Sequence, residues 1–255
     1  MKIATWNVNS LKVRLPHVLE WLAANSPDVL VLQEIKQVSE AFPTAVLAEA
    51  GYASIANGQK TYNGVAAISR SLPADPVTEL PGFDDPQRRV LATTVDGIRV
   101  VDLYVPNGQS VGSEKYDYKL SWLSALHDFL ADEMRRHEKL VVLGDFNIAP
   151  ADEDVYDPEK WGEEILCSPP EREALQRLTA LGLTDVFRKF DQPEKSFSWW
   201  DYRAAGFRRN AGLRIDLILT TDAMTRACNS SYVDKEPRTW ERPSDHAPVV
   251  AEFSI

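Results

Sequence analysis

Short apolar, β-branched runs recur along the whole chain, and they limit the folds that this sequence can adopt. The runs are KIATW, DVLVLQ, GVAAIS, RVLATTV, IRVVDLYV, KLVVLGDF, LRIDLILT and APVVAEFSI. Their length and composition are typical of β-strands. Helical periodicity occurs between only some of them, over residues 13–24, 116–137 and 171–181. This pattern does not fit a strictly alternating parallel sheet, and it predicts two packed strand-rich layers with helices outside.

The size and composition of the chain predict one large domain over residues 1–255. Its composition is 44% apolar and 26% charged, without a repeat or a Gly/Ser linker. No apolar run approaches the ~20 residues of a membrane span, and the first residues lack the features of a secretory signal. The two cysteines, Cys167 and Cys228, have no metal-type spacing. We therefore expect an intracellular, cytoplasmic monomer with no membrane partner.

The charge of the chain is unevenly distributed. A net charge of −10 argues against simple electrostatic binding to nucleic acid. However, the aromatic-rich segment 195–214 holds five basic residues and one acid, whereas residues 151–164 hold seven acids and one base. A local basic loop can bind phosphate on an acidic protein. Net charge therefore leaves the partner open.

Polar side chains follow or interrupt several of the apolar runs. Each of them alone has an ordinary structural explanation, such as an Asx turn or a buried acid paired with a neighbour like Arg214. Their repeated occurrence at strand ends instead predicts a site. The residues concerned are Asn7, Asn9, Gln33, Glu34, Lys36, Asp145, Asn147, Asp216, Ser244, Asp245 and His246.

Carboxylates and carboxamides without cysteine ligands favour a hard cation, most plausibly Mg²⁺. An Asp that orients water, a His that meets developing charge and Asn donors would complete a site for phosphodiester hydrolysis. In such a site Asp216 would orient His246, and Asp245 would serve the metal. Ser244 is a poor candidate nucleophile, because no nucleophile-elbow glycine pattern surrounds it.

The motifs WNVNSL, VLVLQEIK, YNGVAAISR, GDFNIAP, FSWWDYR, GLRIDLIL and SDHAPV occur in order from residue 6 to residue 249. The chain thereby resembles the exonuclease III type of abasic-site endonucleases, within the DNase I-like endonuclease/exonuclease/phosphatase superfamily. The resemblance implies an α/β (α+β) four-layer sandwich in which helices flank two packed mixed β-sheets. It also implies a Mg²⁺-dependent DNA repair phosphodiesterase, with Mn²⁺ as an expected substitute. The implied activities on double-stranded DNA are those of a 3′–5′ exonuclease, a 3′-phosphatase and a 3′-phosphodiesterase, together with incision 5′ to abasic sites.

The resemblance also implies roles for individual residues. Glu34 would be the principal metal ligand, with Asn9 and Asp245 nearby. The catalytic group would comprise Asn7, Tyr104, Asp145, Asn147, Asp216 and His246, in which either Asp145 or His246 handles the proton of the attacking water. DNA contacts would come from Lys36, Tyr62, Asn107, Trp199, Arg203, Arg208, Arg209 and Leu213.

Within the DNA-contacting group, Trp199 and Leu213 match the apolar wall of a pocket for a base-free sugar. Such a pocket could select an abasic nucleotide, which costs least to extrude from the duplex. The region of Leu166 and Cys167 could narrow this pocket. We therefore predict 3′-end processing and leave internal incision open.

Two other functions remain in view. The same fold and site could act on another phosphoester, as in a nonspecific nuclease or an inositol or lipid phosphatase. A non-catalytic binding module is disfavoured, because the full set of acids and the histidine is present.

Overall fold

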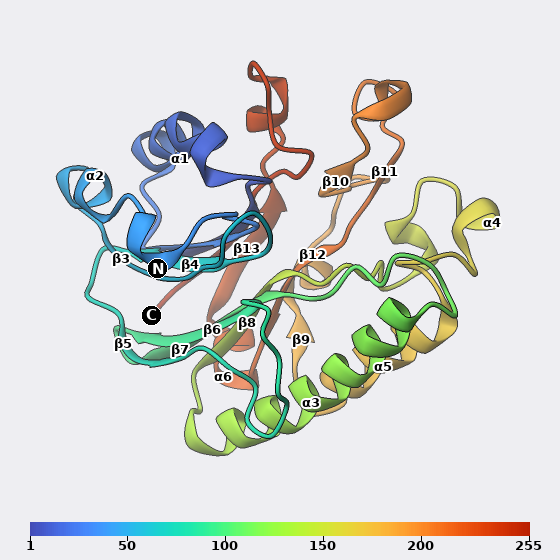
Figure 1. Ribbon diagram of the computed structural model, residues 1–255, viewed down its shortest axis with the longest axis horizontal. Helices are drawn as coiled ribbons and strands as arrows, with labels where there is room; N and C mark the ends of the chain where they lie inside the picture. Colours follow the sequence, from blue (N-terminus) through green and yellow to red (C-terminus); the bar gives the residue numbers. More distant parts are fainter.

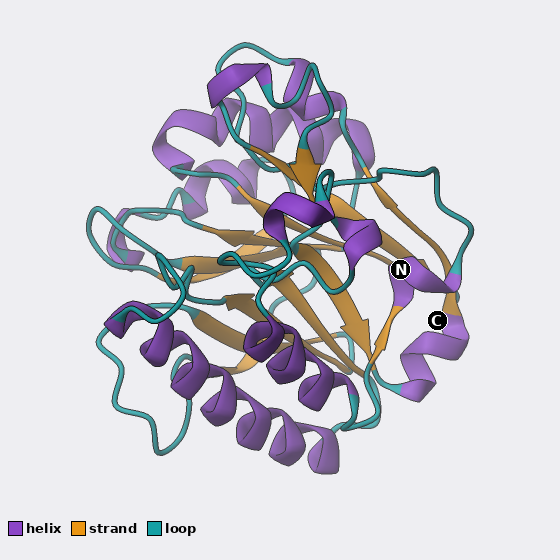
Figure 2. Cartoon of the chain, turned by 90° about the vertical axis from the view of Figure 1, so that its right-hand side faces the viewer, coloured by secondary structure: helices purple, strands orange, loops and turns teal.

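Two six-stranded β-sheets lie face to face in the computed structural model, which describes residues 1–255 (Figure 1). Helices cover the outer face of each sheet, so that the molecule has four layers (Figure 2). The predicted DNase I-like sandwich of two mixed sheets flanked by helices is confirmed. The predictions of one domain over residues 1–255, a monomer and a cytoplasmic location stay predictions.

The first sheet has the order β13-β14-β1-β2-β4-β3, and only its β1–β2 pair is parallel. Its strands are β1 (Lys2–Asn7), β2 (Val29–Gln33), β3 (Ala53–Asn57), β4 (Val65–Ser69), β13 (Cys228–Val233) and β14 (Val249–Phe253).

The second sheet has the order β5-β6-β7-β8-β12-β9, and only its β7–β8 pair is parallel. Its strands are β5 (Ala74–Val77), β6 (Val90–Val95), β7 (Ile98–Tyr104), β8 (Leu140–Asp145), β9 (Thr184–Asp185) and β12 (Asp216–Thr220). A separate two-stranded ribbon consists of β10 (Trp199–Trp200) and β11 (Gly212–Leu213).

Six α-helices and several short 3₁₀ turns connect the strands. The helices are α1 (Leu11–Asn25), α2 (Thr44–Glu49), α3 (Glu114–Arg136), α4 (Pro158–Trp161), α5 (Pro169–Thr179) and α6 (Asp222–Ala227). No helix is both long enough and apolar enough to cross a membrane.

Helix α3 illustrates how local sequence and packing combine. The Ser113 hydroxyl caps the helix by accepting the backbone N–H of Tyr116 at 3.2 Å. Its apolar stripe, which includes Leu123, Leu126 and Leu130, is buried against the outer face of the second sheet. Helices α1 and α2 cover the first sheet in the same manner.

The strand faces that line the core between the two sheets end in polar residues at one end of that core. Side chains two residues apart lie on the same face of a strand. In β8, Val141 and Leu143 belong to the inter-sheet core, and Asp145 is the next residue on that face. In β12, Ile218 belongs to this core, and Asp216 is two residues before it. The catalytic candidates therefore extend the core at one end of the sandwich.

Several elements differ from the sequence-based expectation. Strands β3 and β13 were not expected, because they are short, partly polar and half-exposed. Helix α1 begins earlier than the predicted residue 13, so Pro16 lies inside the helix rather than in its first turn.

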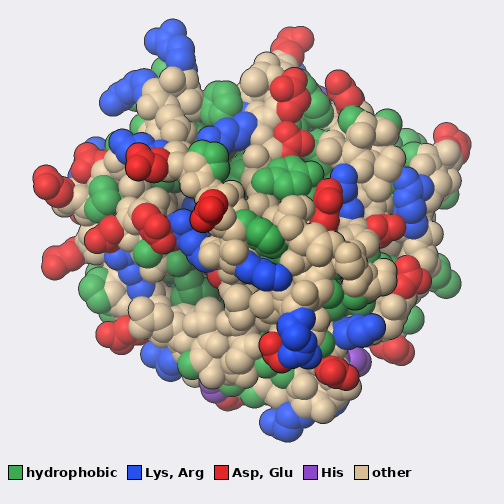
Figure 3. All heavy atoms as spheres, turned by 180° about the vertical axis from the view of Figure 1, so that it is seen from behind, with side chains coloured by type: hydrophobic (Ala, Val, Ile, Leu, Met, Phe, Trp, Pro, Cys, Tyr) green, Lys and Arg blue, Asp and Glu red, His purple; other side chains and the backbone are tan.

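On the back of the molecule, acidic and basic side chains are interspersed (Figure 3).

Candidate active site

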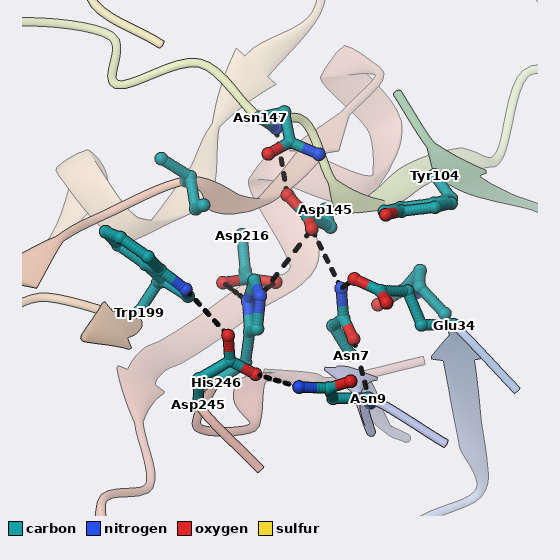
Figure 4. A network of polar contacts seen from close by, with 12 residues as sticks. Asn7, Asn9, Glu34, Tyr104, Asp145, Asn147, Trp199, Asp216, Asp245 and His246 are labelled. Carbon is teal, nitrogen blue, oxygen red and sulfur yellow. Dashed lines mark hydrogen bonds and ion pairs between the residues drawn. The ribbon is translucent and has the colours of Figure 1, made fainter. Parts of the chain in front are cut away.

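The predicted catalytic residues converge at one end of the two sheets (Figure 4). Asn7 ends β1 and Asp145 ends β8, while Glu34 directly follows β2. Asp216 begins β12, and it pairs with Asp145 because the two strands are antiparallel. His246 comes from the loop before β14. The sequence placed these side chains at strand ends, and the packing of the two sheets brings the ends together.

Asn7 links two carboxylates at the centre of this site. Its Nδ2 group donates to Glu34 Oε1 and to Asp145 Oδ2, each at 2.9 Å. Its Oδ1 atom accepts the backbone N–H of Asn9 at 3.0 Å. Asn7 is fully buried, so the orientation of its amide is fixed by these three bonds. Asn7 therefore holds the carboxylates of Glu34 and Asp145 at a fixed separation.

The backbone turns sharply around the site. Asn9, Glu34, Lys36 and Asn147 all have φ between 43° and 54°, in the left-handed region that L-residues seldom adopt. Such conformations cost about 1–3 kcal/mol each and persist only where surrounding contacts enforce them. Here the backbone N–H groups of Val8 and Ser10 bond to the carbonyl oxygens of Gln33 and Glu34, at 3.1 and 2.8 Å.

A buried acid orients the histidine, as predicted from the sequence. His246 Nδ1 lies 2.9 Å from Asp216 Oδ2, and the Ser198 hydroxyl donates to the same oxygen at 2.6 Å. Burial by itself would lower the pKa of His246, but the charges of Asp216 and Asp145 outweigh it and raise the pKa to about 10. The imidazole is therefore protonated at neutral pH.

Arg214 does not pair with Asp216. It binds Asp154, with Nε to Oδ1 at 2.6 Å, and Asp185, with Nη1 to Oδ2 at 2.8 Å. The alternative explanation of Asp216 as the partner of Arg214 is therefore wrong.

Asp145 lies next to the free side of the imidazole. Its Oδ2 atom is 3.7 Å from His246 Nε2, and its Oδ1 atom accepts the backbone N–H of Asn147 at 2.9 Å. Burial raises the pKa of Asp145 to about 7, although His246 and the hydrogen bond from Asn7 act in the opposite direction. Asp145 can therefore exchange a proton near neutral pH.

Two carboxylates could hold a cation, and an imidazole lies beside them. One oxygen each of Glu34 and Asp145 and a ring nitrogen of His246 lie within 4.8 Å of one another, but the protonated imidazole described above cannot bind a metal. Two carboxylates in a site open on one side suit a hard divalent ion. The charge of Glu34 is balanced in this structure by Lys36, whose Nζ atom lies 2.9 Å from Glu34 Oε2. Lys36, predicted as a DNA contact, therefore lies beside the candidate metal ligand Glu34.

Asp245 and Asn9, predicted near the metal, lie on the opposite side of Asn7 from Asp145 (Figure 4). Both oxygens of Asp245 are occupied: Asn9 Nδ2 donates to Oδ1 and Trp199 Nε1 donates to Oδ2, each at 3.0 Å. Asn9 Oδ1 accepts from Lys36 Nζ at 2.6 Å. A metal role for this pair stays a prediction, and the carboxylate beside Glu34 is instead that of Asp145.

Tyr104, Asn107 and Asn147 line the site on the side of the second sheet. Asn147 Nδ2 donates to the carbonyl oxygen of Val105 at 2.9 Å, and its Oδ1 accepts from Asn107 Nδ2 at 3.2 Å. Burial and the nearby charges of Glu34 and Asp145 raise the pKa of Tyr104 well above its usual value. Its hydroxyl thus remains a donor at neutral pH.

The predicted pocket wall is closed by its own side chains. Leu213 is 0% exposed and Leu166 only 4%, and both pack in one apolar cluster with Cys167. Trp199 lies at the edge of this cluster. Burial also raises the pKa of the Cys167 thiol to about 12, so this cysteine is unreactive. Leu166 and Cys167 therefore belong to the same buried cluster as the predicted wall residue Leu213.

The remaining predicted DNA contacts are exposed side chains. Tyr62 is 68% exposed and lines a cavity of about 680 Å³, which Asn107, Arg89 and Lys115 also line. Exposed Arg203, Arg208 and Arg209 lie on the loop between β10 and β11.

Two serines complete the site, and only Ser244 was considered from the sequence. No local pattern distinguishes Ser198, which gains a role only because the fold brings Asp216 of β12 within hydrogen-bond distance of its hydroxyl. Ser244 is buried, and its hydroxyl donates to the Asn7 carbonyl oxygen at 2.7 Å while accepting the N–H of His246 at 3.2 Å. These bonds give Ser244 a structural role, in agreement with its rejection as a nucleophile.

Fold and site together define a hydrolase with a candidate metal centre. The chain belongs to the Endonuclease/Exonuclease/phosphatase family, whose model matches residues 4–246. Within this family it is a nuclease of the exonuclease III and abasic-site endonuclease type.

Three comparisons support this assignment. The chain is 36% identical to exodeoxyribonuclease III of Haemophilus influenzae, over 99% of this chain and 100% of that protein. It is 55% identical, with a TM-score of 0.98, to a 3′ phosphatase from Neisseria whose structure holds a product DNA hairpin. It is 39% identical, with a TM-score of 0.96, to an AP endonuclease from Archaeoglobus fulgidus. Both structural comparisons cover 100% of each chain.

Proposed function

We propose that the protein is a Mg²⁺-dependent DNA repair phosphodiesterase that cleans the 3′ ends of double-stranded DNA. It would remove 3′ phosphates, 3′ phosphodiesters and 3′-terminal nucleotides. The observation that carries the proposal is the cluster of Glu34, Asp145 and His246 at the end of the two sheets. The same substrate class is supported by the Haemophilus exodeoxyribonuclease and by the Neisseria 3′ phosphatase with its bound DNA.

The protonation states divide the acid–base work. His246 is held as an imidazolium by Asp216, so it donates to a phosphoryl oxygen and cannot take the proton of water. Asp145, with a pKa raised to about 7 by burial, is the group able to accept that proton. The Asn7 amide keeps the carboxylate of Asp145 turned toward the site.

Neutral donors would bind the phosphate that reacts. The Tyr104 hydroxyl points to the same space as Asp145 (Figure 4), and the Asn107 amide donates to Asn147, whose backbone N–H binds Asp145. Both donors would meet charge that develops on the phosphoryl oxygens. Mg²⁺ held principally by the carboxylate of Glu34 would neutralise part of that charge.

The closed apolar wall favours frayed 3′ ends over internal abasic sites. An internal abasic sugar would enter beside Trp199 and Leu213, and Leu213 is fully buried in a cluster that also holds Leu166. A terminal phosphate needs less room, because no nucleotide follows it. Incision at abasic sites is therefore the second activity that we propose, at a lower rate than 3′-end cleaning.

Two labelled duplexes test the proposal, one with a recessed 3′ phosphate and one with an internal abasic analogue. Each is incubated with Mg²⁺ or EDTA. We expect release of the 3′ phosphate in Mg²⁺ but not in EDTA, and slower incision of the abasic duplex. Absence of phosphate release in Mg²⁺ contradicts the proposal.

The same assay separates the other functions. Turnover of an inositol phosphate or a phospholipid, with no turnover of either duplex, would assign the site to another phosphoester. Binding of the duplexes without any turnover would indicate a non-catalytic module.

A further inference from the structure

A fully buried ion pair lies behind the phosphate-binding side of the site. It joins Lys119 of α3 to Glu171 at the start of α5, and both side chains are 0% exposed. Buried ion pairs are seldom the most stable solution for a protein core, because both charges must be removed from water. Neither residue belongs to the catalytic set described above, so the contacts of the pair indicate its role.

Lys119 binds the backbone on which two site residues stand. Its Nζ group donates to the carbonyl oxygen of Asn147 at 2.7 Å and to that of Asn107 at 3.1 Å. The third partner of the ammonium group is the carboxylate of Glu171. The ammonium group thus has three acceptors, two of which are the backbones of the asparagines that would contact phosphate.

Glu171 binds the segment that closes the apolar wall. Its Oε1 atom accepts the backbone N–H of Leu166 at 3.1 Å, and its Oε2 atom accepts the N–H and hydroxyl of Ser168 at 3.1 and 2.6 Å. Leu166 is held in a left-handed conformation with φ of 76°, which a leucine adopts only when its surroundings enforce it. The carbonyl oxygen of Leu166 in turn accepts the N–H of Ala149 at 2.7 Å.

Packing ties the same three segments together. A Cβ atom placed on Gly108 would lie 2.9 Å from Ile165 Cδ1 and 3.1 Å from Lys119 Cδ, so the loop carrying Asn107 touches the wall segment directly. Gly108 also has φ of 90°, which favours glycine.

We propose that Lys119 and Glu171 are positioning residues that fix the wall residue Leu166 relative to the phosphate-binding residues Asn107 and Asn147, and thereby set the preference between 3′ ends and internal abasic sites. This inference rests on the proposed function. The pair couples two parts of the site that come from distant stretches of the chain. Loss of the ion pair frees the Leu166 segment and the backbone of the two asparagines. It therefore changes the rate at which bound substrate reacts and the preference between the two substrates.

The test compares two neutralised ion pairs. Lys119→Met/Glu171→Gln removes the pair, and Arg99→Met/Glu133→Gln is the matched control. The control pair is also buried, with side chains 3% exposed, and joins β7 to α3 at the opposite end of both elements from Tyr104 and Lys119. Thermal unfolding of all variants sets an assay temperature at which each is folded.

For the Lys119 double variant we expect kcat for 3′-phosphate release to fall by about tenfold, with KM changed by less than about threefold. We expect the ratio of abasic incision to 3′-phosphate release to rise by at least about threefold. The control should keep the wild-type ratio. If the double variant does not fold, Glu171→Gln alone should change the ratio in the same direction, because it keeps the side-chain shape but loses the charge.

Equal ratios in the Lys119 and control variants overturn this inference while leaving the proposed function intact. Failure of the wild-type protein to release phosphate instead overturns the proposed function.

Discussion

The Nδ1 atom of His246 lies 2.9 Å from Oδ2 of Asp216, and neither side chain is more than 4% exposed. The contact fixes the ring and favours its protonated form, so only Nε2 remains to act on a substrate. It gives the buried acid in the apolar run LRIDLILT a chemical role.

Asp216→Asn should therefore lower activity with little change in fold. The amide keeps the shape of the side chain but cannot stabilise the imidazolium, so the pKa of His246 should fall. We expect a loss of up to about 10⁴-fold in kcat, the loss seen when the orienting acid of a Ser-His-Asp triad is replaced by its amide. Single-turnover release of 3′ phosphate measures the rate, and NMR titration of His246 measures the pKa. An unchanged pKa would contradict this role of Asp216.

Much of this arrangement could be predicted from the sequence, because most of the catalytic residues lie at or next to an end of an apolar strand. Asn7, Glu34, Asp145 and Asp216 were all found in this way, and the longer helices were located to within a few residues. Local sequence carries this information, since strand ends and helix stripes are periodic features.

Other parts depend on contacts that no local pattern encodes. Ser198 acquires its role only when β12 packs beside it, and Lys119 resembles any lysine on an amphipathic helix until α5 covers it. Asp245 was expected near the metal, but only the folded chain shows that Asn9 and Trp199 occupy both of its oxygens.

Metal binding should depend more on Glu34 than on Asp245. Mg²⁺ that binds the folded protein raises its free energy of unfolding, by about 2.7 kcal/mol at 100 times Kd. Replacing a residue that only hydrogen-bonds a metal ligand typically weakens metal binding by roughly 10–100-fold. We expect Glu34→Gln to weaken Mg²⁺ binding by more than this, and Asp245→Asn to weaken it by no more than this. Unfolding in a Mg²⁺ titration gives both values. A larger effect of Asp245→Asn would restore Asp245 as the main partner of Glu34.

A buried acid below the site should make stability depend on pH. Asp102 is 0% exposed between the sheets, and its Oδ1 atom accepts Gln33 Nε2 at 2.6 Å. Burial raises the pKa of Asp102 well above 3.8, so the folded protein keeps a proton that the unfolded chain releases. The stability that this proton provides is complete below about pH 4 and is lost as pH rises toward the folded pKa.

Asp102→Asn should remove this dependence. The free energy of unfolding of the variant relative to wild type should increase between pH 4 and the folded pKa of Asp102, by up to about 1.4 kcal/mol per pH unit. Urea unfolding at pH 5, 6, 7 and 8 measures the difference. A difference that is constant across this range would mean that Asp102 is charged in the folded state.

Opening the apolar wall should change substrate choice. Leu166→Gly removes a side chain from the buried cluster that holds Leu213, and glycine suits a φ of 76°. We expect the variant to be less stable than wild type by about 2 kcal/mol, since about 3 kcal/mol of packing is lost and about 1 kcal/mol of strain is relieved. Leu166→Ala should be the less stable of the two, because it keeps the strain.

In Leu166→Gly the rate of incision at an internal abasic analogue should rise at least about tenfold relative to 3′-phosphate release. Both rates come from the same preparation, so partial unfolding cancels in their ratio. An unchanged ratio would show that Leu166 does not limit entry of the abasic sugar.

The most direct test of the central claim measures release of inorganic phosphate from a 3′-phosphorylated duplex in a single turnover with Mg²⁺. Wild-type protein is compared with Asp145→Asn, because Asp145 is the proposed base and lies beside His246 and Asn7. We expect the variant to bind the duplex with a similar Kd but to release phosphate at least about 10³-fold more slowly. Release at the wild-type rate by Asp145→Asn would place the reaction outside this site and contradict the account.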